Sequence, residues 1–261
     1  MDVIYEPGIS YRRALQIDKM WAESDATGKL YAEVMGMAAL KGSERVLDVA
    51  AGTGCLMQLL AEALPQGQAI GLDRSAAMVR LAQTKLVRSR ASQASVMRSE
   101  GEDLIFKSSA FDAAFCVLGL YHFGDPLAAL KEMKRLLRKG GRLILCEYEA
   151  PADPGLRAAL TESFQMVHPD YRFHTGPELY TLVSDAAFAL ERSATMRFTF
   201  DQHGVGGIPM GVHFFETRFM LERRGDPDLL ASFDGNIFRP AGPMMHLRGA
   251  LSFTLLRAVK P

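Results

Sequence analysis

The alternation of short apolar runs with helix-like segments between residues 45 and 148 constrains the fold of this chain more than any other feature. Four runs have the length and composition of buried strands, namely "RVLDVA", "AIGLD", "FDAAFCVL" and "RLILCEYE". In the segment "DPLAALKEMKRLLRKGG", Asp125 predicts a helix N-cap, Pro126 suits the first helical position, and Gly140 is expected to end the helix. Strands that alternate with helices predict an α/β, Rossmann-like fold, in which a mostly parallel sheet has helices on both faces.

The stretch "VLDVAAGTG", residues 46–54, predicts a ligand site where the first strand meets its helix. A helix N-terminus offers unpaired backbone N–H groups, and Gly52 and Gly54 allow close approach to the backbone. A dinucleotide fingerprint would need a third glycine where this chain has Met57. The carboxylate of Asp48 suits a cationic ligand better than a pyrophosphate, and S-adenosylmethionine carries an ammonium and a sulfonium group and no phosphate.

The second strand ends in Asp73, just under 20 residues after the glycines. An acid at this position is suited to accept hydrogen bonds from both ribose hydroxyls of an adenosine. This feature does not separate S-adenosylmethionine from a nicotinamide cofactor, because both contain that ribose. A helix N-cap is the alternative role of Asp73, although Ser75 suits that role better.

These stretches, together with "SEGEDLIF" and the run from Phe111 to Glu149, resemble class I S-adenosylmethionine-dependent methyltransferases in order and spacing. The likeness is greatest to the branch that contains the ubiquinone and menaquinone biosynthesis C-methyltransferases. The resemblance implies a seven-stranded sheet, S-adenosylmethionine as cofactor and S-adenosylhomocysteine as product. It also implies the cofactor-binding residues Asp48, Ala50, Gly52, Gly54, Asp73, Arg74, Met78, Glu100, Gly101, Glu102, Cys116 and Leu118.

Two positions depart from the pattern of that family. Ala50 stands at the first glycine of its GxGxG motif, and we expect binding to be retained. Glu100 stands where the family often has an aspartate that meets the adenine amino group, so the acceptor is kept on a longer side chain.

Residues that follow the fourth and fifth strands are the candidates for catalysis, because ligands of open α/β sheets lie beyond the carboxyl ends of the strands. Tyr121 and His122 follow the fourth strand, and Glu147 ends the fifth. His122 is the favoured general base, and a loop histidine packed against the next helix is the alternative. No metal site is expected, because no histidine accompanies Glu147 and Glu149 at ligand spacing.

The segments outside the alternating region predict a substrate cap. We divide the chain into an N-terminal helical cap at 1–44, a cofactor-binding core at 45–200, an insertion or substrate lid at 201–249, and a final core strand at 250–261. The insertion is rich in Gly, Pro, Met and Phe and is expected to be partly helical around "VHFFETRFMLERR". It would line an acceptor pocket, form a dimer contact or cover the core.

Composition narrows the partners of the chain. The formal net charge of zero gives no broad attraction to nucleic acid. The three cysteines are widely spaced and form no CxxC, which favours a reducing cytoplasm over a disulfide framework. No apolar run approaches the ~20 residues of a membrane span. We expect a small-molecule substrate, and a homodimer stays open.

The sequence therefore predicts a methyltransferase that acts on a small, hydrophobic or aromatic acceptor, with C- or O-methylation favoured over N-methylation. The alternative is an enzyme of the same fold that binds S-adenosylmethionine but catalyses an elimination, decarboxylation or rearrangement. A nicotinamide oxidoreductase and a binding module without turnover are weaker alternatives.

Overall fold

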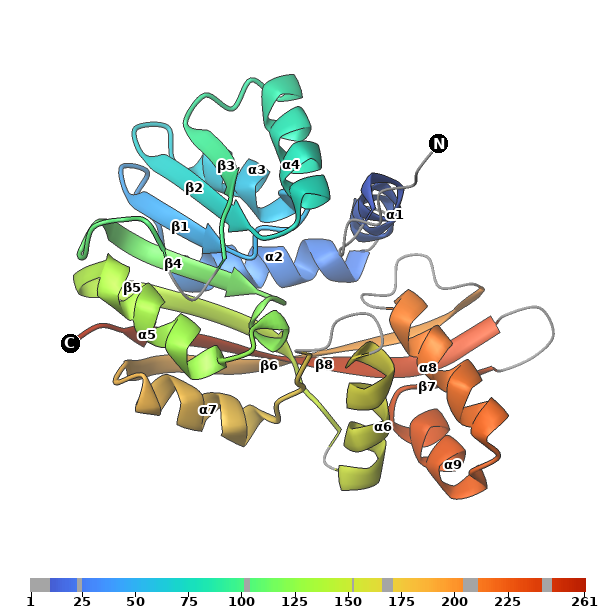
Figure 1. The fold of residues 1–261 in the computed structure, drawn as a ribbon. Coiled ribbons are helices and arrows are strands. Elements are labelled where there is room, and N and C mark those ends of the chain that lie inside the picture. Colours follow the sequence, from blue (N-terminus) through green and yellow to red (C-terminus); the bar gives the residue numbers. More distant parts are fainter. Residues whose placement is uncertain are drawn as a thin grey trace, which may run out of the picture.

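The computed structural model describes residues 10–22, 25–100, 104–151, 153–165, 171–203, 211–240 and 246–261. Among these residues one sheet runs through the molecule in the order β3-β2-β1-β4-β5-β8-β6, and a short strand, β7, also pairs with β8 (Figure 1). The parallel part consists of β1 (Arg45–Val49), β2 (Gln68–Asp73), β3 (Ala94–Arg98), β4 (Phe111–Val117) and β5 (Leu137–Tyr148). The predicted Rossmann-like, mostly parallel sheet is confirmed.

The last part of the sheet is antiparallel. β8 (His246–Val259) lies between β5 and β6 (Ala189–His203) and runs antiparallel to both, and β7 is Phe238–Pro240. Glu147 pairs with Thr254 in the β5–β8 register. Because β6 and β8 continue well past the end of β5, their far ends form an extension of the sheet, to which β7 adds a short third strand and which the helices of the C-terminal half adjoin (Figure 1).

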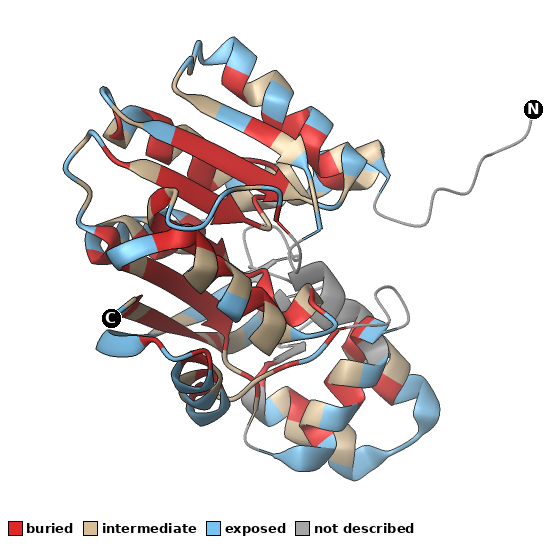
Figure 2. Ribbon diagram, turned by 60° about the vertical axis from the view of Figure 1, so that its left-hand side comes forward, coloured by how far each residue is buried: buried red, intermediate tan, exposed pale blue. Residues whose placement is uncertain are grey.

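Two apolar layers cover the sheet, and most of each central strand is buried (Figure 2). One layer includes α2 (Asp25–Ala38), α3 (Cys55–Ala63) and α4 (Ala76–Arg88), and the other includes α5 (Pro126–Leu136) and α7 (Gly176–Asp185). α1 (Tyr11–Ala22) packs on α4, where Ala14 contacts Met78 and Leu81. Helices therefore lie on both faces, as the alternating sequence predicts.

Three further helices gather beside the extension of β6 and β8. α6 (Pro154–Gln165) packs against α8 (Gly211–Arg224), and α9 (Pro227–Asn236) contacts both helices as well as β7 and β8 (Figure 1). The bidentate ion pair between Arg218 and Asp234, with N–O distances of 2.7 and 3.0 Å, joins α8 to α9. The expected helix around "VHFFETRFMLERR" is present as α8.

The predicted N-caps of two helices in the alternating region are confirmed. Asp125 caps α5, and Ser75 caps α4 by accepting the N–H of Met78. The prediction that Gly140 ends a helix is wrong, because α5 stops at Leu136 and Gly140 lies in β5. The physical reason is pairing with the C-terminus: the Gly140 N–H donates to the carbonyl of Lys260 at 2.9 Å.

The predicted division of the chain stays a prediction. Its boundary at 200 falls inside β6, and its boundary at 249 falls inside β8, because the two strands continue as one ladder from Ala189 to His203.

Candidate active site

The turn after β1 has a left-handed backbone at three positions. Ala50 has a φ of 64°, Gly52 a φ of 53° and Gly54 a φ of 78°. A Cβ atom added to Gly54 would lie 2.8 Å from the Cβ of Ala82, so this glycine lets α3 begin directly against α4. A Cβ atom added to Gly52 would meet nothing within 4 Å. The backbone of the turn is therefore packed against the protein at Gly54 and accessible at Gly52, so a ligand could approach it there.

Asp48 is the second-to-last residue of β1, and its side chain is a buried carboxyl group. It exposes only 2% of its surface, and its Oδ2 atom has no hydrogen-bond partner among the described residues. Burial raises the pKa of this carboxyl well above its ordinary value, and the nearby charge of Asp73 raises it further. A buried acceptor without a donor is costly, and a cationic or hydrogen-bond-donating ligand would satisfy it.

Asp73 ties the end of β2 to the glycine turn. Its Oδ2 atom accepts the N–H of Gly52 at 2.8 Å, and its Oδ1 atom accepts the N–H of Ser75 at 2.8 Å. Burial raises the pKa of the Asp73 carboxyl, and these two hydrogen bonds act in the opposite direction. Since Ser75 is the cap of α4, the N-cap alternative for Asp73 does not apply, and its remaining lone pairs are available to ribose hydroxyls.

The turn after β4 packs directly on the turn after β1. A Cβ atom added to Gly119 would lie 2.5 Å from the Cβ of Ala50 and 3.2 Å from the Sγ of Cys116. Leu118 has a φ of 54°, and its N–H donates to the carbonyl of Cys146 at 2.7 Å. Cys116 is fully buried, and its side chain packs beneath this junction.

Glu147 holds this second turn in place. Its Oε1 atom accepts the N–H of Gly119 at 3.0 Å and the N–H of Leu120 at 2.7 Å. The side chain is 2% exposed, and Oε2 has no partner among the described residues. Burial raises the pKa of Glu147 to about 8, against the lowering effect of the two backbone hydrogen bonds. The sequence predicts a catalytic role for Glu147, and the observed contacts are those of a group that shapes the site.

Tyr121 belongs to an aromatic cluster just beyond the ends of β4 and β5. The members are the buried residues Tyr121, Tyr148, Phe164, Tyr171, Phe173 and Phe253. The hydroxyl groups of Tyr121 and Tyr171 are hydrogen-bonded to each other, and their rings are 4.4 Å apart. Burial raises the pKa of Tyr121 far above its ordinary value, so Tyr121 stays a neutral phenol.

His122 lies at the edge of this cluster and is half-buried. Its ring centroid is 4.5 Å from that of Tyr121 and 5.0 Å from that of Tyr171, which it meets edge-on. Its backbone N–H donates to the carbonyl of Gly119 at 3.0 Å, so the histidine belongs to the turn that Glu147 holds. His122 is therefore the only one of the three predicted catalytic residues with a partly accessible side chain.

The predicted adenine residues differ in surroundings. Arg74 and Glu100 are exposed, and Glu100 lies near enough to Asp73 to raise the pKa of that carboxyl. Met78 is 7% exposed and packs under α1 with Ala14 and Leu81. Gly101 and Glu102 lie outside the described residues.

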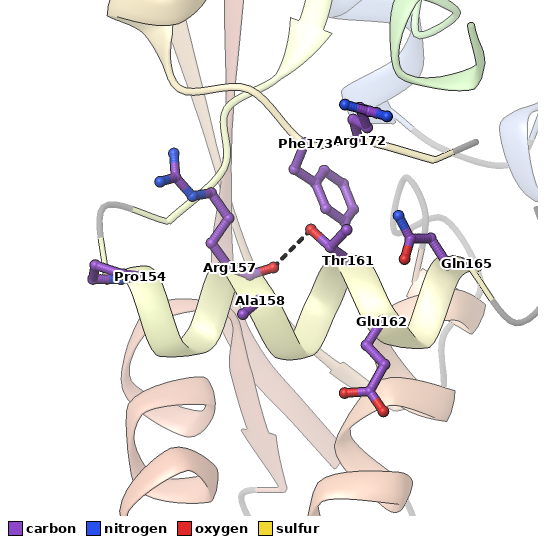
Figure 3. Close-up of a pocket in the computed structure, with 8 residues that line it drawn as sticks. All are labelled: Pro154, Arg157, Ala158, Thr161, Glu162, Gln165, Arg172 and Phe173. Carbon is purple, nitrogen blue, oxygen red and sulfur yellow. Dashed lines mark hydrogen bonds between the residues drawn. The ribbon is translucent and has the colours of Figure 1, made fainter. Parts of the chain in front are cut away.

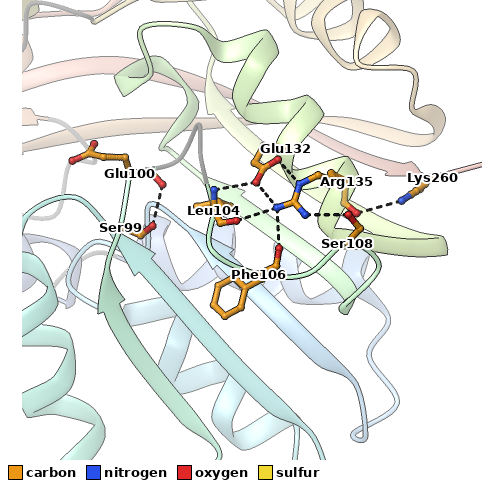
Figure 4. Close-up of polar contacts among 8 residues, drawn as sticks. All are labelled: Ser99, Glu100, Leu104, Phe106, Ser108, Glu132, Arg135 and Lys260. Carbon is orange, nitrogen blue, oxygen red and sulfur yellow. Dashed lines mark hydrogen bonds and ion pairs between the residues drawn. The ribbon is translucent and has the colours of Figure 1, made fainter.

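The sequence offers no signal for a polar network that anchors the chain just after this region. On α5, Glu132 accepts the N–H of Leu104 at 3.0 Å, and Arg135 donates to the carbonyls of Leu104 and Phe106 at 3.0 and 2.9 Å (Figure 4). Glu132 and Arg135 are also paired with each other at 2.6 Å. The pair fixes the segment that leads from the Glu100 region to β4.

Tyr31 on α2 is a further neighbour of the site that sequence reasoning missed. Burial raises the pKa of its phenol, and the charges of Cys55 and Asp48 contribute to the same shift. Its place beside Asp48 depends on how α2 packs on the sheet, and nothing in the local pattern of the helix indicates it.

A separate shallow groove lies on α6. It is lined by Pro154, Arg157, Ala158, Thr161, Glu162, Gln165, Arg172 and Phe173 (Figure 3). Phe173 belongs to both this groove and the aromatic cluster, but none of the predicted cofactor-binding residues lines it. Across the described ranges, no group of three or more His, Cys, Asp or Glu side chains is arranged to hold a metal ion.

Comparisons with known proteins agree with this geometry. Residues 47–145 match the model of a family described as "Methyltransferase domain". A ubiquinone/menaquinone biosynthesis C-methyltransferase of Syntrophotalea carbinolica is 32% identical over 149 residues, which cover 57% of this chain and 59% of that protein. A demethylmenaquinone methyltransferase of Deinococcus radiodurans is 35% identical over 158 residues, which cover 60% and 61%. The chain thus spans about three fifths of the length of these relatives.

Solved structures share the fold of this chain. The crystal structure of a Bacillus halodurans protein superposes with a TM-score of 0.71 at 21% identity and covers 90% of this chain and 100% of its own. In a search of the described residues, no helix is both long and apolar enough to cross a membrane. The residues at the turn fit S-adenosylmethionine as the cofactor, because a positively charged ligand would satisfy the Asp48 oxygen that has no partner among the described residues, and the open Gly52 backbone leaves room for it.

Proposed function

We propose that this protein transfers the methyl group of S-adenosylmethionine to a small hydrophobic acceptor. The premise is that residues 47–145, which match the model of a methyltransferase domain, bind this cofactor. The observation that carries the proposal is the pairing of two features at one turn. Asp48 offers a buried acceptor without a donor, and Asp73 holds the adjoining Gly52 backbone. A cationic nucleoside satisfies both, whereas a pyrophosphate would meet two negative side chains.

Each part of the cofactor is bound by a different part of the site. Asp73 accepts the ribose hydroxyls, the backbone of Ala50 to Gly54 surrounds the methionine part, and Asp48 faces its positive charge. The cofactor supplies an electrophilic methyl group on a sulfonium. The chain supplies alignment, which contributes roughly 7–11 kcal/mol when two reactants are held in a near-attack arrangement.

The acceptor is proposed to be a phenolic or quinone-like aromatic compound. The aromatic cluster and His122 lie beyond the ends of β4 and β5, where an acceptor must sit in a fold of this kind. The two relatives reported above are named as quinone methyltransferases, which supports this acceptor class and favours methyl transfer over the non-methylating alternative. His122 is the proposed general base, because Tyr121 and Glu147 are buried.

Transfer of labelled methyl tests the proposal. Purified protein is incubated with methyl-labelled S-adenosylmethionine and a reduced short-chain demethylmenaquinone, with a simple phenol and a primary amine as comparison acceptors. We expect label in the quinol product and formation of S-adenosylhomocysteine. A product that forms without label would instead support the non-methylating alternative, and failure to bind the cofactor in a calorimetric titration would overturn the premise.

A further inference from the structure

The carboxyl group of Glu147 is buried at the end of β5, and no ion pair with it is present among the described residues. Its Oε1 atom accepts two backbone N–H groups, those of Gly119 and Leu120, and its Oε2 atom is buried without a hydrogen-bond partner among the described residues. Ion pairs in the described structure do not involve it. A charge in such a place is unfavourable, so the empty protein holds Glu147 as a neutral acid with one uncommitted oxygen.

The groups that face Glu147 are uncharged. Cys116 on β4, Cys146 on β5, and the phenols of Tyr121 and Tyr171 all lie within its electrostatic reach, since a charge on Glu147 raises the pKa of each. Thr254 is opposite it on β8 and is buried. Each of these neighbours is neutral at physiological pH, so none of them stabilises a carboxylate here.

The turn that Glu147 holds adjoins the proposed cofactor turn. Gly119, which Glu147 holds, lies against Ala50, and the thiol of Cys116 is within electrostatic reach of both Glu147 and Asp48. The two buried acids lie on β1 and β5, the strands on either side of β4, beside the backbone that is proposed to surround the methionine part. A sulfonium bound there would bring a positive charge near both acids.

We propose that Glu147 is a positioning residue that releases its proton to solvent when the sulfonium form of the cofactor binds, and that it keeps this proton when the demethylated product binds. The inference rests on the proposed function. S-adenosylmethionine and S-adenosylhomocysteine share the adenosine, the carboxylate and the amine, and they differ by a methyl group and one positive charge at sulfur. Glu147 thereby favours substrate over product through charge alone, and the preference grows as the pH rises.

Calorimetric titration with both ligands measures the number of protons that are released on binding. Heats of binding are collected at about pH 7.5 in two buffers with different ionisation enthalpies, which gives the number of protons released by the wild type and by Glu147→Gln. The ligand amine also titrates near this pH, but the same ligand is bound by both proteins, so its contribution cancels between the wild type and the variant. Asp48 is present in both proteins and cancels between them.

We expect the wild type to release about half a proton or more beyond Glu147→Gln with S-adenosylmethionine, and no excess with S-adenosylhomocysteine. Between pH 7 and pH 8 the affinity of the wild type for S-adenosylmethionine should rise about threefold or more beyond that of the variant, because the release of half a proton per bound ligand changes the affinity by about that factor per pH unit. Equal proton release by the two proteins overturns the inference while leaving the proposed function intact.

Glu44→Gln is the matched control. Glu44 is also a buried acid that accepts backbone N–H groups, those of Lys41, Gly42 and Ser43, but Arg142 pairs with it at the opposite end of the sheet. This variant should release the same protons as the wild type. If Glu147→Gln does not fold, a carbon-13 NMR titration of the glutamate carboxyl groups in the wild type reports the protonation state of Glu147. A Glu147 signal that is unchanged by S-adenosylmethionine overturns the inference.

Discussion

The carboxylate of Asp73 accepts the backbone N–H of Gly52 at 2.8 Å, and this one bond joins the end of β2 to the turn that follows β1. The two residues are 21 positions apart, and the adjacent parallel strands bring them together. The same carboxylate also accepts the N–H of Ser75, at the start of α4. One acidic side chain therefore sets the positions of two backbone segments that border the proposed cofactor site.

Replacing Asp73 by alanine should weaken cofactor binding. The loss of a charged hydrogen-bond acceptor for the ribose is expected to cost about 1–3 kcal/mol of binding free energy, because hydrogen bonds to charged groups are stronger than neutral ones. Calorimetric titration with S-adenosylhomocysteine measures this directly. Asp73→Asn is the comparison, since the amide retains one acceptor for Gly52, and it should lose less affinity than Asp73→Ala. Unchanged affinity in a folded Asp73→Ala protein contradicts the ribose assignment.

Much of this site could be predicted from the sequence because its residues lie at strand ends. Asp48, Gly52 and Asp73 are placed by the rule that ligands lie at the carboxyl edge of a parallel sheet, and the alternating pattern already defines that edge. The same pattern places the helices on both faces. A local rule fails at Gly140, because its partner, Lys260, comes from the far end of the chain.

The rest depends on packing between distant segments. Tyr31 and Tyr171 come from the N-terminal helices and from a loop after α6, and only the folded chain brings them to the ends of β1 and β4. Glu147 looks like a rim residue in "CEYEAP", yet the turn at Gly119 folds over it and β8 pairs beside it. Burial of this kind is a property of the assembled sheet and leaves no mark in the local sequence.

Ala50 and Gly119 should show strong coupling in a double-mutant cycle. Gly119→Ala places a Cβ atom 2.5 Å from that of Ala50, so we expect it to cost on the order of 1–3 kcal/mol of unfolding free energy through overpacking. Ala50→Gly removes the opposing methyl group and suits the left-handed backbone at φ 64°, so it should be neutral or stabilising. The double variant should regain part of the loss, as measured by urea unfolding. Additive effects would mean that the two methyl groups do not compete.

His122→Ala should lower turnover and leave cofactor affinity nearly intact. A general base contributes typically 10²–10⁴-fold to a rate, and the ring of His122 lies among the aromatic residues and away from Asp48 and Asp73. Single-turnover methyl transfer and calorimetric titration of the same variant separate the two effects. His122→Gln keeps hydrogen-bonding capacity without the basicity, and recovery of the full rate by this variant would assign His122 a packing or orienting role.

Arg135→Met should loosen the segment from Leu104 to Phe106. The substitution removes the hydrogen bonds to both carbonyls and leaves Glu132 without its partner, at an expected cost of about 1–3 kcal/mol in unfolding free energy. Hydrogen exchange at the Leu104 amide, which Glu132 holds, should accelerate more than exchange in β1. Arg138→Met is the control, because that arginine pairs with Asp112 and is half exposed. Equal exchange rates in the two variants would show that the network does not anchor the segment.

Glu147 should make the stability of the ligand-free protein depend on pH in the direction opposite to most acids. Its pKa in the folded state is about 8, above the value of about 4.5 for a free glutamate, so its contribution to stability is complete below about pH 4.5 and is lost as the pH rises to 8. Over that range the contribution falls by about 1.4 kcal/mol per pH unit, to a total on the order of 5 kcal/mol.

Glu147→Gln isolates this contribution, because the amide does not ionise and keeps an acceptor for Gly119 and Leu120. The free energy of unfolding of the wild type minus that of the variant should therefore decrease steadily between about pH 5 and pH 8. Below that range the difference should no longer depend on pH. Urea unfolding at a series of pH values measures the difference. A difference that is independent of pH would mean that Glu147 ionises in the folded protein as it does in the unfolded chain, and that solvent or a nearby donor reaches its second oxygen.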